Sequence, residues 1–228
     1  MNWDIPSNTR NEFKFVTDSL NYHKLRGWLL NHSQGFLEAF PSRKINNVYF
    51  DTHDLKAYKD NLFGSSSRVK LRYRWYGNKL APDQGNLELK CKKNRIGWKF
   101  RHKIKKLEFG SGVSWRDFRG QIRNQLPPDW KIHLDSRTEV VLINRYWRNY
   151  FESRDGKVMV NLDTQQSIAG QFSQLVPNLN SKGNFLDSVV LEVKSSWDDY
   201  DLTHKFMQNL PLSWSRHSKY IVGVNSLR

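Results

Sequence analysis

The stretch Arg68-Val69-Lys70-Leu71-Arg72-Tyr73-Arg74-Trp75 alternates cationic and apolar residues without interruption. Because successive side chains of a β-strand point to opposite faces, a strand here places every cation on one face and every apolar side chain on the other. An ordinary sheet surface mixes signs, since like charges close together on one face repel each other. A solvated outer face is nevertheless the usual explanation for a run of charge, and this segment alone favours it.

Three further segments repeat this design and change the interpretation. Residues 10–15, 86–92 and 190–194 each combine an aliphatic or aromatic face with a face of cations and a carboxylate. The charged faces carry Arg10, Glu12 and Lys14; Glu88, Lys90 and Lys92; and Glu192 and Lys194. Such strands in one antiparallel sheet can close into a barrel with an ionic interior, provided that a polyanion and a metal ion neutralise the charge. Cations that line such a concave surface attract phosphate oxygens more strongly than the same row in open water.

Glu12, Glu88 and Glu192 each stand alone on a cationic strand face. Hard divalent cations such as Mg²⁺ take oxygen ligands and often combine one or two carboxylates with phosphate oxygens. The three glutamates are therefore candidate metal ligands. A salt bridge to a neighbouring Lys or Arg within the sheet explains each of them equally well, so both interpretations stay open at this point.

Alternation of period two between short turn signals predicts an α+β fold that is mostly antiparallel β-sheet with a few helices around it. Strands are expected at residues 10–16, 46–51, 68–75, 86–92, 98–105, 137–151, 157–163 and 188–194. Helical spacing predicts helices at residues 18–31, 54–62, 114–125 and 198–209, with N-caps at Asp18, Asp54, Ser114 and Asp198.

The composition indicates a single domain over residues 1–228 and a polyanionic partner. With 37 Lys and Arg against 22 Asp and Glu, the formal net charge is +15, which is more than solubility requires. No long linker divides the chain, and no stretch approaches about 18 consecutive apolar residues. Cys91 is the only cysteine, which excludes an intramolecular disulfide and a Cys-based zinc site. These features predict a cytoplasmic protein.

Several short motifs follow one another along the chain: Tyr49-Phe50-Asp51-Thr52, Tyr146-Trp147-Arg148, Leu162-Asp163-Thr164 and Ser218-Lys219-Tyr220. Together with the charged strands, this ordered set resembles the VTC (vacuolar transporter chaperone) polyphosphate polymerase domain of the triphosphate tunnel metalloenzymes, from about Arg10 to Val224. The resemblance implies an eight-stranded antiparallel tunnel with flanking helices that binds triphosphate or polyphosphate and a divalent metal, Mn²⁺ or Mg²⁺. In such polymerases the γ-phosphoryl group of ATP is transferred to a growing polyphosphate chain, and ADP is released.

Carried over position by position, the resemblance also implies roles for individual residues. The cations that contact the reacting phosphates would be Lys14, Arg72, Arg74, Lys90, Arg148 and Lys219. Further substrate contacts would come from Arg10, Arg68, Lys70, Lys99, Lys194, Arg216 and the hydroxyl of Ser218. Glu192 would be the principal metal ligand, and Glu12 and Glu88 remain candidates beside it.

The chain departs from the family at Met159, four residues before Asp163, where the family usually carries an inward-facing arginine. The departure removes one cation from the expected tunnel wall. Lys157 lies two residues earlier on the same predicted strand face and is a candidate replacement.

A polyphosphate polymerase is therefore the first interpretation, and three alternatives stand beside it. Attack by water would make the same tunnel a hydrolase of triphosphate or polyphosphate, and Met159 favours a non-catalytic module that binds polyphosphate. Charge alone fits a nucleic-acid-binding domain, which we do not expect because the cation-rich residues 90–106 lie within an alternating strand pair. The resemblance also raises a membrane partner protein, through which a cytoplasmic chain would associate with a membrane.

Overall fold

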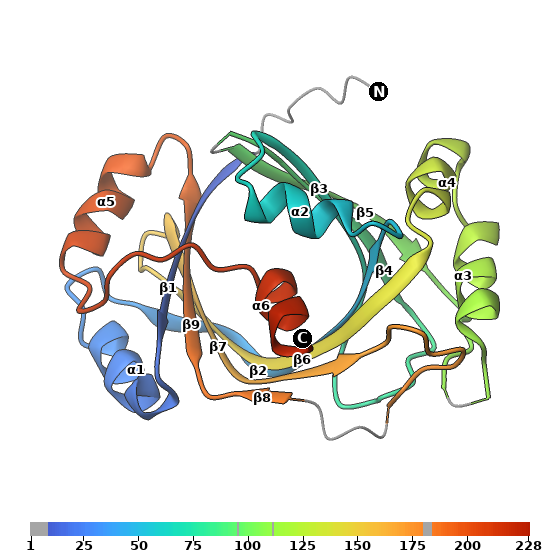
Figure 1. Ribbon diagram of the computed structural model, residues 1–228. Helices are drawn as coiled ribbons and strands as arrows, with labels where there is room; N and C mark the ends of the chain where they lie inside the picture. The colour runs from blue at the N-terminus through green and yellow to red at the C-terminus, as the bar shows by residue number, and fades with distance from the viewer. Residues whose placement is uncertain (1–8, 95, 111, 180–183) are drawn as a thin grey trace.

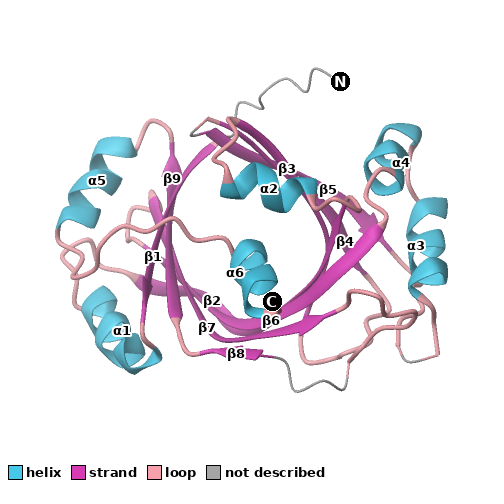
Figure 2. Ribbon diagram, viewed as in Figure 1, coloured by secondary structure: helices cyan, strands magenta, loops and turns pink. Residues whose placement is uncertain are grey.

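The computed structural model describes residues 9–94, 96–110, 112–179 and 184–228. Its sheet closes into a ring of eight antiparallel strands in the order β6-β2-β3-β4-β5-β1-β9-β7, and a direct pairing of β7 with β6 completes the ring (Figures 1 and 2). The strands are β1 (Arg10–Thr17), β2 (Leu37–Asp51), β3 (Ser67–Tyr76), β4 (Gly85–Lys93), β5 (Ile96–Ile104), β6 (Glu139–Glu152), β7 (Val158–Gly170) and β9 (Val189–Ser196), while the short β8 (Asn184–Leu186) is an additional partner of β7. The expected α+β fold with an eight-stranded antiparallel tunnel is confirmed.

The helices lie in three places around the ring (Figure 1). Helices α1 (Tyr22–Leu30) and α5 (Tyr200–Gln208) flank β1 and β9 on one side, and a 3₁₀ turn (Ser19–Asn21) precedes α1. Helices α3 (Trp115–Asn124) and α4 (Pro128–Asp135) lie on the opposite side, and α2 (Lys56–Leu62) and α6 (Lys219–Ser226) lie across one end of the ring. Within the described residues, every helix is too short or too polar to cross a membrane.

The apolar faces of the strands point outward and are covered by the flanking helices. Leu71 and Tyr73 of β3 are fully buried with Phe118 of α3, and Leu191 of β9 is buried with Leu29 of α1. Burial of each such side chain stabilises the fold by roughly 1.5–3 kcal/mol. Because side chains alternate along a strand, the charged residues between these apolar ones point into the ring.

Helix α6 packs inside one end of the ring, against β6 and β7. A Cβ at Gly223 would lie 2.8 Å from a methyl carbon of Leu142, so any larger residue here would force the Leu142 side chain to move. Tyr220 stacks on Tyr49 of β2, with 5.1 Å between ring centroids, and its hydroxyl donates a hydrogen bond of 2.6 Å to Asp51. We call this end of the ring, where β2 ends and β3 begins, the covered end.

The sequence prediction misses α4, α6, the short β8 and the first half of β2. The α6 sequence contains Ile221, Val222, Gly223 and Val224, residues with weak helix propensity, so tertiary packing determines this helix. The first half of β2 pairs with β6 through two register shifts, and these irregularities interrupt the alternation that would have revealed a strand.

Two of the four expected helix caps are confirmed. The side chains of Asp18 and Ser114 accept backbone N–H bonds at the starts of the 3₁₀ turn and of α3. The cap predicted at Asp54 is wrong, because the carboxylate of Asp51 instead accepts the N–H groups of residues 57 and 58 in the first turn of α2. The cap predicted at Asp198 is also wrong, because α5 begins one residue later and its cap residue makes no side-chain hydrogen bond to the helix.

Candidate functional site

The cations of β3 lie inside the ring and contact side chains from several other strands. Arg72 donates hydrogen bonds of 2.9 and 2.6 Å to Glu88 of β4, and Arg74 donates to Asn47 of β2 at 2.8 Å and to the hydroxyl of Tyr146 of β6 at 3.2 Å. The alternation that the sequence shows therefore places these guanidinium groups toward a shared interior axis and away from the outer surface.

Glu88 sits at the centre of an arginine cluster. Its carboxylate lies within 3.8 Å of Arg72 and Arg74 and 3.2 Å from Nε of Arg101 on β5. Burial favours the neutral acid, but attraction to Arg72 and Arg74 outweighs that effect and lowers the pKa of Glu88 below its ordinary value. Glu88 is therefore ionised and already neutralised by guanidinium groups.

Glu192 of β9 organises a second cluster on the other side of the ring. Its carboxylate lies 2.7 Å from Lys194, 3.1 Å from Arg148 of β6 and 3.4 Å from Lys14 of β1. Lys14 also contacts Glu12 at 3.0 Å, so one ammonium group bridges the two glutamates. Burial alone would raise the pKa of Glu192, but Lys194 and Arg148 hold it well below its ordinary value.

Asp163 of β7 is a central interior residue to which the sequence analysis gave no role. It is fully buried, accepts two hydrogen bonds from Arg148 at 2.5 and 2.7 Å and lies 2.5 Å from Nζ of Lys219. Against the effect of burial, these two cations lower the pKa of Asp163 to about 2. Its motif, Leu162-Asp163-Thr164, was noted, and the alternation of Asn161 with Asp163 along β7 is the signal that marks both as inward-facing.

Tyr146 links the two clusters and was also missed. Its hydroxyl accepts from Arg74, while the ammonium group of Lys219 lies 4.7 Å and the guanidinium carbon of Arg148 5.4 Å from its ring centroid. The alternation of Tyr146 with Arg148 on β6 places both side chains inside the ring. The aromatic side chain of Tyr146 therefore lies between cations from β3, β6 and α6.

Lys70 differs from Arg72, Lys90 and the cations around Glu192 because its described partners are neutral. Its ammonium group donates hydrogen bonds of 2.8 Å to Asn61 of α2 and to the hydroxyl of Ser218, which precedes α6. Desolvation, with repulsion from Lys90, Lys14 and other cations, lowers the pKa of Lys70 well below its ordinary value. Binding of an anion next to the ammonium group of Lys70 is therefore favourable.

The remaining sequence-predicted residues occupy different places. Lys90 of β4 donates hydrogen bonds of 3.0 and 2.9 Å to Glu12, and Lys99 is the cross-strand partner of Lys90 on β5, so both belong to the inner face. Arg68 is half-buried and is the second residue of β3, near the covered end. Arg10, at the start of β1, and Arg216, before α6, are exposed, and the structure does not bring them into the clusters around Glu88 and Glu192.

The prediction that Lys157 replaces the missing family arginine is wrong. Met159 is the cross-strand partner of Lys194 and so belongs to the inner face, as expected. Lys157 precedes β7, its side chain is 55% exposed, and its ammonium group lies 4.0 Å from Asp199 outside the ring. The strand begins too late for the alternation to reach this lysine.

A divalent metal fits two of the three predicted ligands. Glu12 and Glu192 lie on neighbouring strands and share Lys14, so their oxygens can complete a cation's shell together with phosphate and water. Glu88 does not fit, because in the described ion pairs its three arginines contact neither Glu12 nor Glu192, so it does not form a pair with a second glutamate. Within the described residues there is no group of three His, Cys, Asp or Glu side chains that could hold a metal by themselves.

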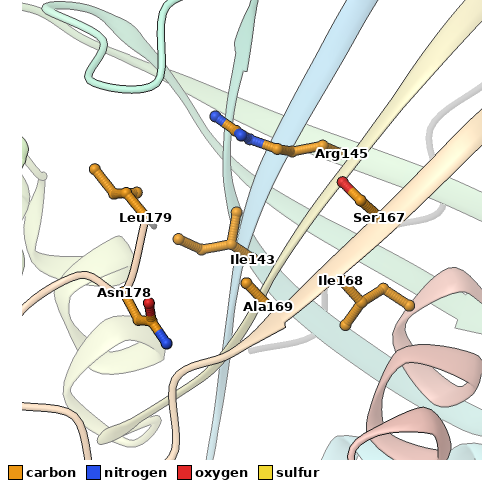
Figure 3. A pocket seen from close by; sticks show the side chains of 7 residues that line it. All are labelled: Ile143, Arg145, Ser167, Ile168, Ala169, Asn178 and Leu179. Carbon is orange, nitrogen blue, oxygen red and sulfur yellow. The ribbon is translucent and has the colours of Figure 1, made fainter. Parts of the chain in front are cut away.

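A small cavity lies apart from these clusters, on β6, β7 and the segment that follows (Figure 3). It measures about 30 Å³ and is lined by Ile143, Arg145, Ser167, Ile168, Ala169, Asn178 and Leu179. This volume holds about two water molecules, which is too little for a triphosphate. The charged clusters inside the ring, and not this cavity, define the candidate site.

The closed eight-stranded ring with a cationic interior defines a triphosphate tunnel fold, the class of enzymes that act on triphosphates and generally depend on a metal. Within this class, the chain belongs to the VTC domain family, whose family model matches residues 9–228. A search among curated proteins finds no match.

Solved structures share the fold at low sequence identity. A candidate adenylyl cyclase from Hippeastrum, described as having a dominant triphosphatase activity, is 16% identical with a TM-score of 0.55, and the match covers 96% of each chain. A candidate adenylate cyclase from Vibrio parahaemolyticus is 13% identical with a TM-score of 0.52 and coverage of 93% of this chain and 96% of the other. The PH1819 protein of Pyrococcus horikoshii is 12% identical with a TM-score of 0.50 and coverage of 95% and 99%.

Proposed function

We propose that the protein is a metal-dependent polyphosphate polymerase that transfers the γ-phosphoryl group of ATP to a growing polyphosphate chain inside the ring. The observation that carries the proposal is the interior cation Lys70, whose described partners are neutral and whose cationic neighbours repel it. A desolvated cation in such a place is stabilised when an anion binds beside it. A phosphate chain supplies anionic oxygens along the whole row of β3.

The interior residues divide the work of phosphoryl transfer, which consists mainly of alignment and charge neutralisation. Lys70, Arg72, Arg74 and Lys90 hold the phosphates from the side of β3 and β4. The second side supplies Lys14, Arg148, Lys194 and Lys219, which Glu192 and Asp163 keep in fixed positions. Further phosphate contacts would come from Arg68 and Ser218 at the covered end, from Lys99 on the inner face of β5, and from the exposed Arg10 and Arg216.

The reaction needs no protein nucleophile. An ionised terminal oxygen of the acceptor chain attacks the γ-phosphorus of ATP, a new P–O bond forms, and the bond to the β-phosphate oxygen breaks with release of ADP. No proton has to be removed from the attacking oxygen. Glu12 and Glu192 would hold the divalent metal, which when bound neutralises the charge that spreads over the transferring group.

A triphosphatase is the second candidate function, because the site contains a carboxylate near the phosphate path. The side chain of Glu12 is 24% exposed, whereas that of Glu192 is only 6% exposed. A partly hydrated carboxylate can orient a water molecule for attack on the terminal phosphorus. The similar fold from Hippeastrum, described as a triphosphatase, is consistent with this chemistry on a related scaffold.

Product analysis separates these functions. The protein is incubated with ATP and Mn²⁺, the products are resolved on a gel, and released phosphate is measured in parallel. Long anionic chains support the polymerase, free phosphate without chains supports the triphosphatase, and tight binding without turnover under either Mn²⁺ or Mg²⁺ supports a non-catalytic module. The double variant Arg72→Ala/Arg74→Ala should lose the activity. Arg123→Ala, which removes only an exposed ion pair with Asp135, is the matched control.

A further inference from the structure

The two ends of the ring differ in what borders the interior cations. At the covered end, Ser218 and Lys219 at the start of α6 contact Lys70 and Asp163 directly. Helices α2 and α6 lie across this end (Figure 2). A bulky group attached to a phosphate chain in the ring therefore has its place at the opposite end.

The opposite end carries an aromatic group around one arginine. The guanidinium carbon of Arg43 lies 4.6 Å from the ring centroid of Tyr76 and 4.9 Å from that of Tyr150, and its Nε donates a 3.0 Å hydrogen bond to the Tyr150 hydroxyl. Phe40 meets Tyr150 edge to face, with 5.9 Å between centroids. We call Phe40, Arg43, Tyr76 and Tyr150 the rim group.

Strand register places the rim group on the inner face. Arg43 is the cross-strand partner of Arg148, and Tyr150 is the partner of Asn161, which bonds to Glu192 inside the ring. Tyr76 follows the interior residue Arg74 by two positions on β3. Two strand residues span about 7 Å, so the rim group lies one short step beyond the interior guanidinium groups.

The rim group leaves large aromatic surface in contact with water. Phe40 is 59% and Tyr76 41% exposed, and Arg43 is also exposed. The β2 strand is irregular here, with register shifts on both sides of Phe40 and a proline at position 41. Such irregularities are common at barrel rims, where they redirect side chains beside functional sites. Exposed rings at the end of a phosphate-binding row fit a planar ligand attached to phosphates.

We propose that the rim group is the nucleobase subsite: it stacks on the base of a nucleoside triphosphate whose phosphates lie among the interior cations. The inference rests on the proposed function and adds the place where the base of the nucleotide binds, a group that inorganic triphosphate lacks. Stacking uses the π-face that every base presents, so the subsite recognises the presence of a base more than its identity. Arg43 orients the two tyrosine rings by cation–π contact.

The test compares two ligands in the same variants. Isothermal titration calorimetry measures the Kd of ATP and of inorganic triphosphate, each with Mg²⁺, for the wild-type protein and for Tyr76→Ala, Arg43→Ala and the conservative Tyr76→Phe. Loss of stacking is expected to weaken ATP binding by about 5- to 100-fold in the two alanine variants and to leave triphosphate within about twofold. Tyr76→Phe should retain ATP affinity. Phe63→Ala, which removes an exposed aromatic side chain just after α2, is the matched control.

The outcomes separate this inference from the proposed function. Equal weakening of ATP and triphosphate, or no change for ATP, would overturn the nucleobase subsite and leave phosphate binding intact. Failure of the wild-type protein to bind either ligand would refute the proposed function and the subsite with it. Thermal unfolding of each variant confirms folding. Arg43→Ala decides the question if Tyr76→Ala does not fold, because loss of the guanidinium group that orients both tyrosine rings should weaken ATP binding and leave triphosphate binding unchanged.

Discussion

The cations of the two sides of the ring differ in what balances their charge. Around Glu192, each of Lys14, Arg148 and Lys194 contacts a carboxylate directly. Lys70 on β3, by contrast, contacts an amide and a hydroxyl oxygen. The cations around Glu192 are fixed by internal ion pairs before any ligand binds, whereas Lys70 retains its charge for a ligand.

This difference explains how one interior can be both stable and ready for a polyanion. Buried charges without partners destabilise a fold, so a ring lined by cations alone would not persist. The carboxylates Glu12, Glu88, Asp163 and Glu192 neutralise and orient most of the cations. Only the remaining charge has to be met by phosphate, and changes on the two sides should therefore have different effects.

The largest effect is expected for Glu192→Gln, which removes the charge that fixes the ion-paired side and the proposed metal. Loss of one preorganised electrostatic group typically lowers kcat by roughly 100- to 1,000-fold. Turnover measured against Mn²⁺ concentration should lose its metal stimulation. Glu38→Gln, which affects only an exposed pair with Arg26, is the control. Metal-stimulated turnover retained in Glu192→Gln would remove the metal assignment.

Arg74→Ala should have the next largest effect. Arg74 is buried, its hydrogen bonds go to neutral groups on β2 and β6, and Glu88 lies 3.8 Å away and is shared with Arg72 and Arg101, so Arg74 retains charge for phosphate. A charge-assisted contact contributes about 1.5–3 kcal/mol, so affinity and rate should both fall by roughly 10- to 150-fold, and Arg72→Ala should act in the same direction. Steady-state kinetics beside the Arg123→Ala control measure this. Unchanged kinetics in both variants would contradict their role in substrate binding.

Lys70→Met should separate stability from binding. The folded-state pKa of Lys70 lies below its unfolded value of 10.5, so between these two values the unfolded chain binds more protons and stability rises with pH. At neutral pH the buried lysine therefore weakens the anion-free fold. The variant should unfold at a temperature a few degrees higher without ligand, yet bind triphosphate more weakly than wild type. A lower melting temperature together with unchanged binding would show that Lys70 has a purely structural role.

Much of the ring could be predicted because alternation is a local signal. Arg72, Arg74, Lys90 and Glu192 lie on the inner face, as period two along each strand required. Alternation does not reveal which strands face each other across the ring. It therefore gave no sign that Arg148 would pair with Asp163 or that Glu88 would lie among arginines instead of beside Glu12.

The ends of the ring were less accessible to sequence reasoning for a different reason. Helix α6 depends on packing inside the ring, and its sequence alone does not favour a helix. The rim residues Phe40 and Arg43 lie in an irregular part of β2, where the period-two pattern is interrupted. Lys157 lies before the first residue of β7, a boundary that alternation places only within a few residues.

The smallest effect is expected for Met159→Arg. This change adds a cation to the inner face of β7, close to the cations that are ion-paired around Glu192. Met159 lies opposite Lys194 on β9 and opposite Glu152 on β6, and it is partly exposed. Because Glu152 and solvent screen part of the new charge, affinity for triphosphate should rise by only about two- to fivefold and the gain should shrink at high salt. Met159→Leu keeps the volume without the charge and should bind like wild type. If both variants bind alike at low salt, then residue 159 lies off the phosphate path, and the absence of the family arginine has no consequence for binding.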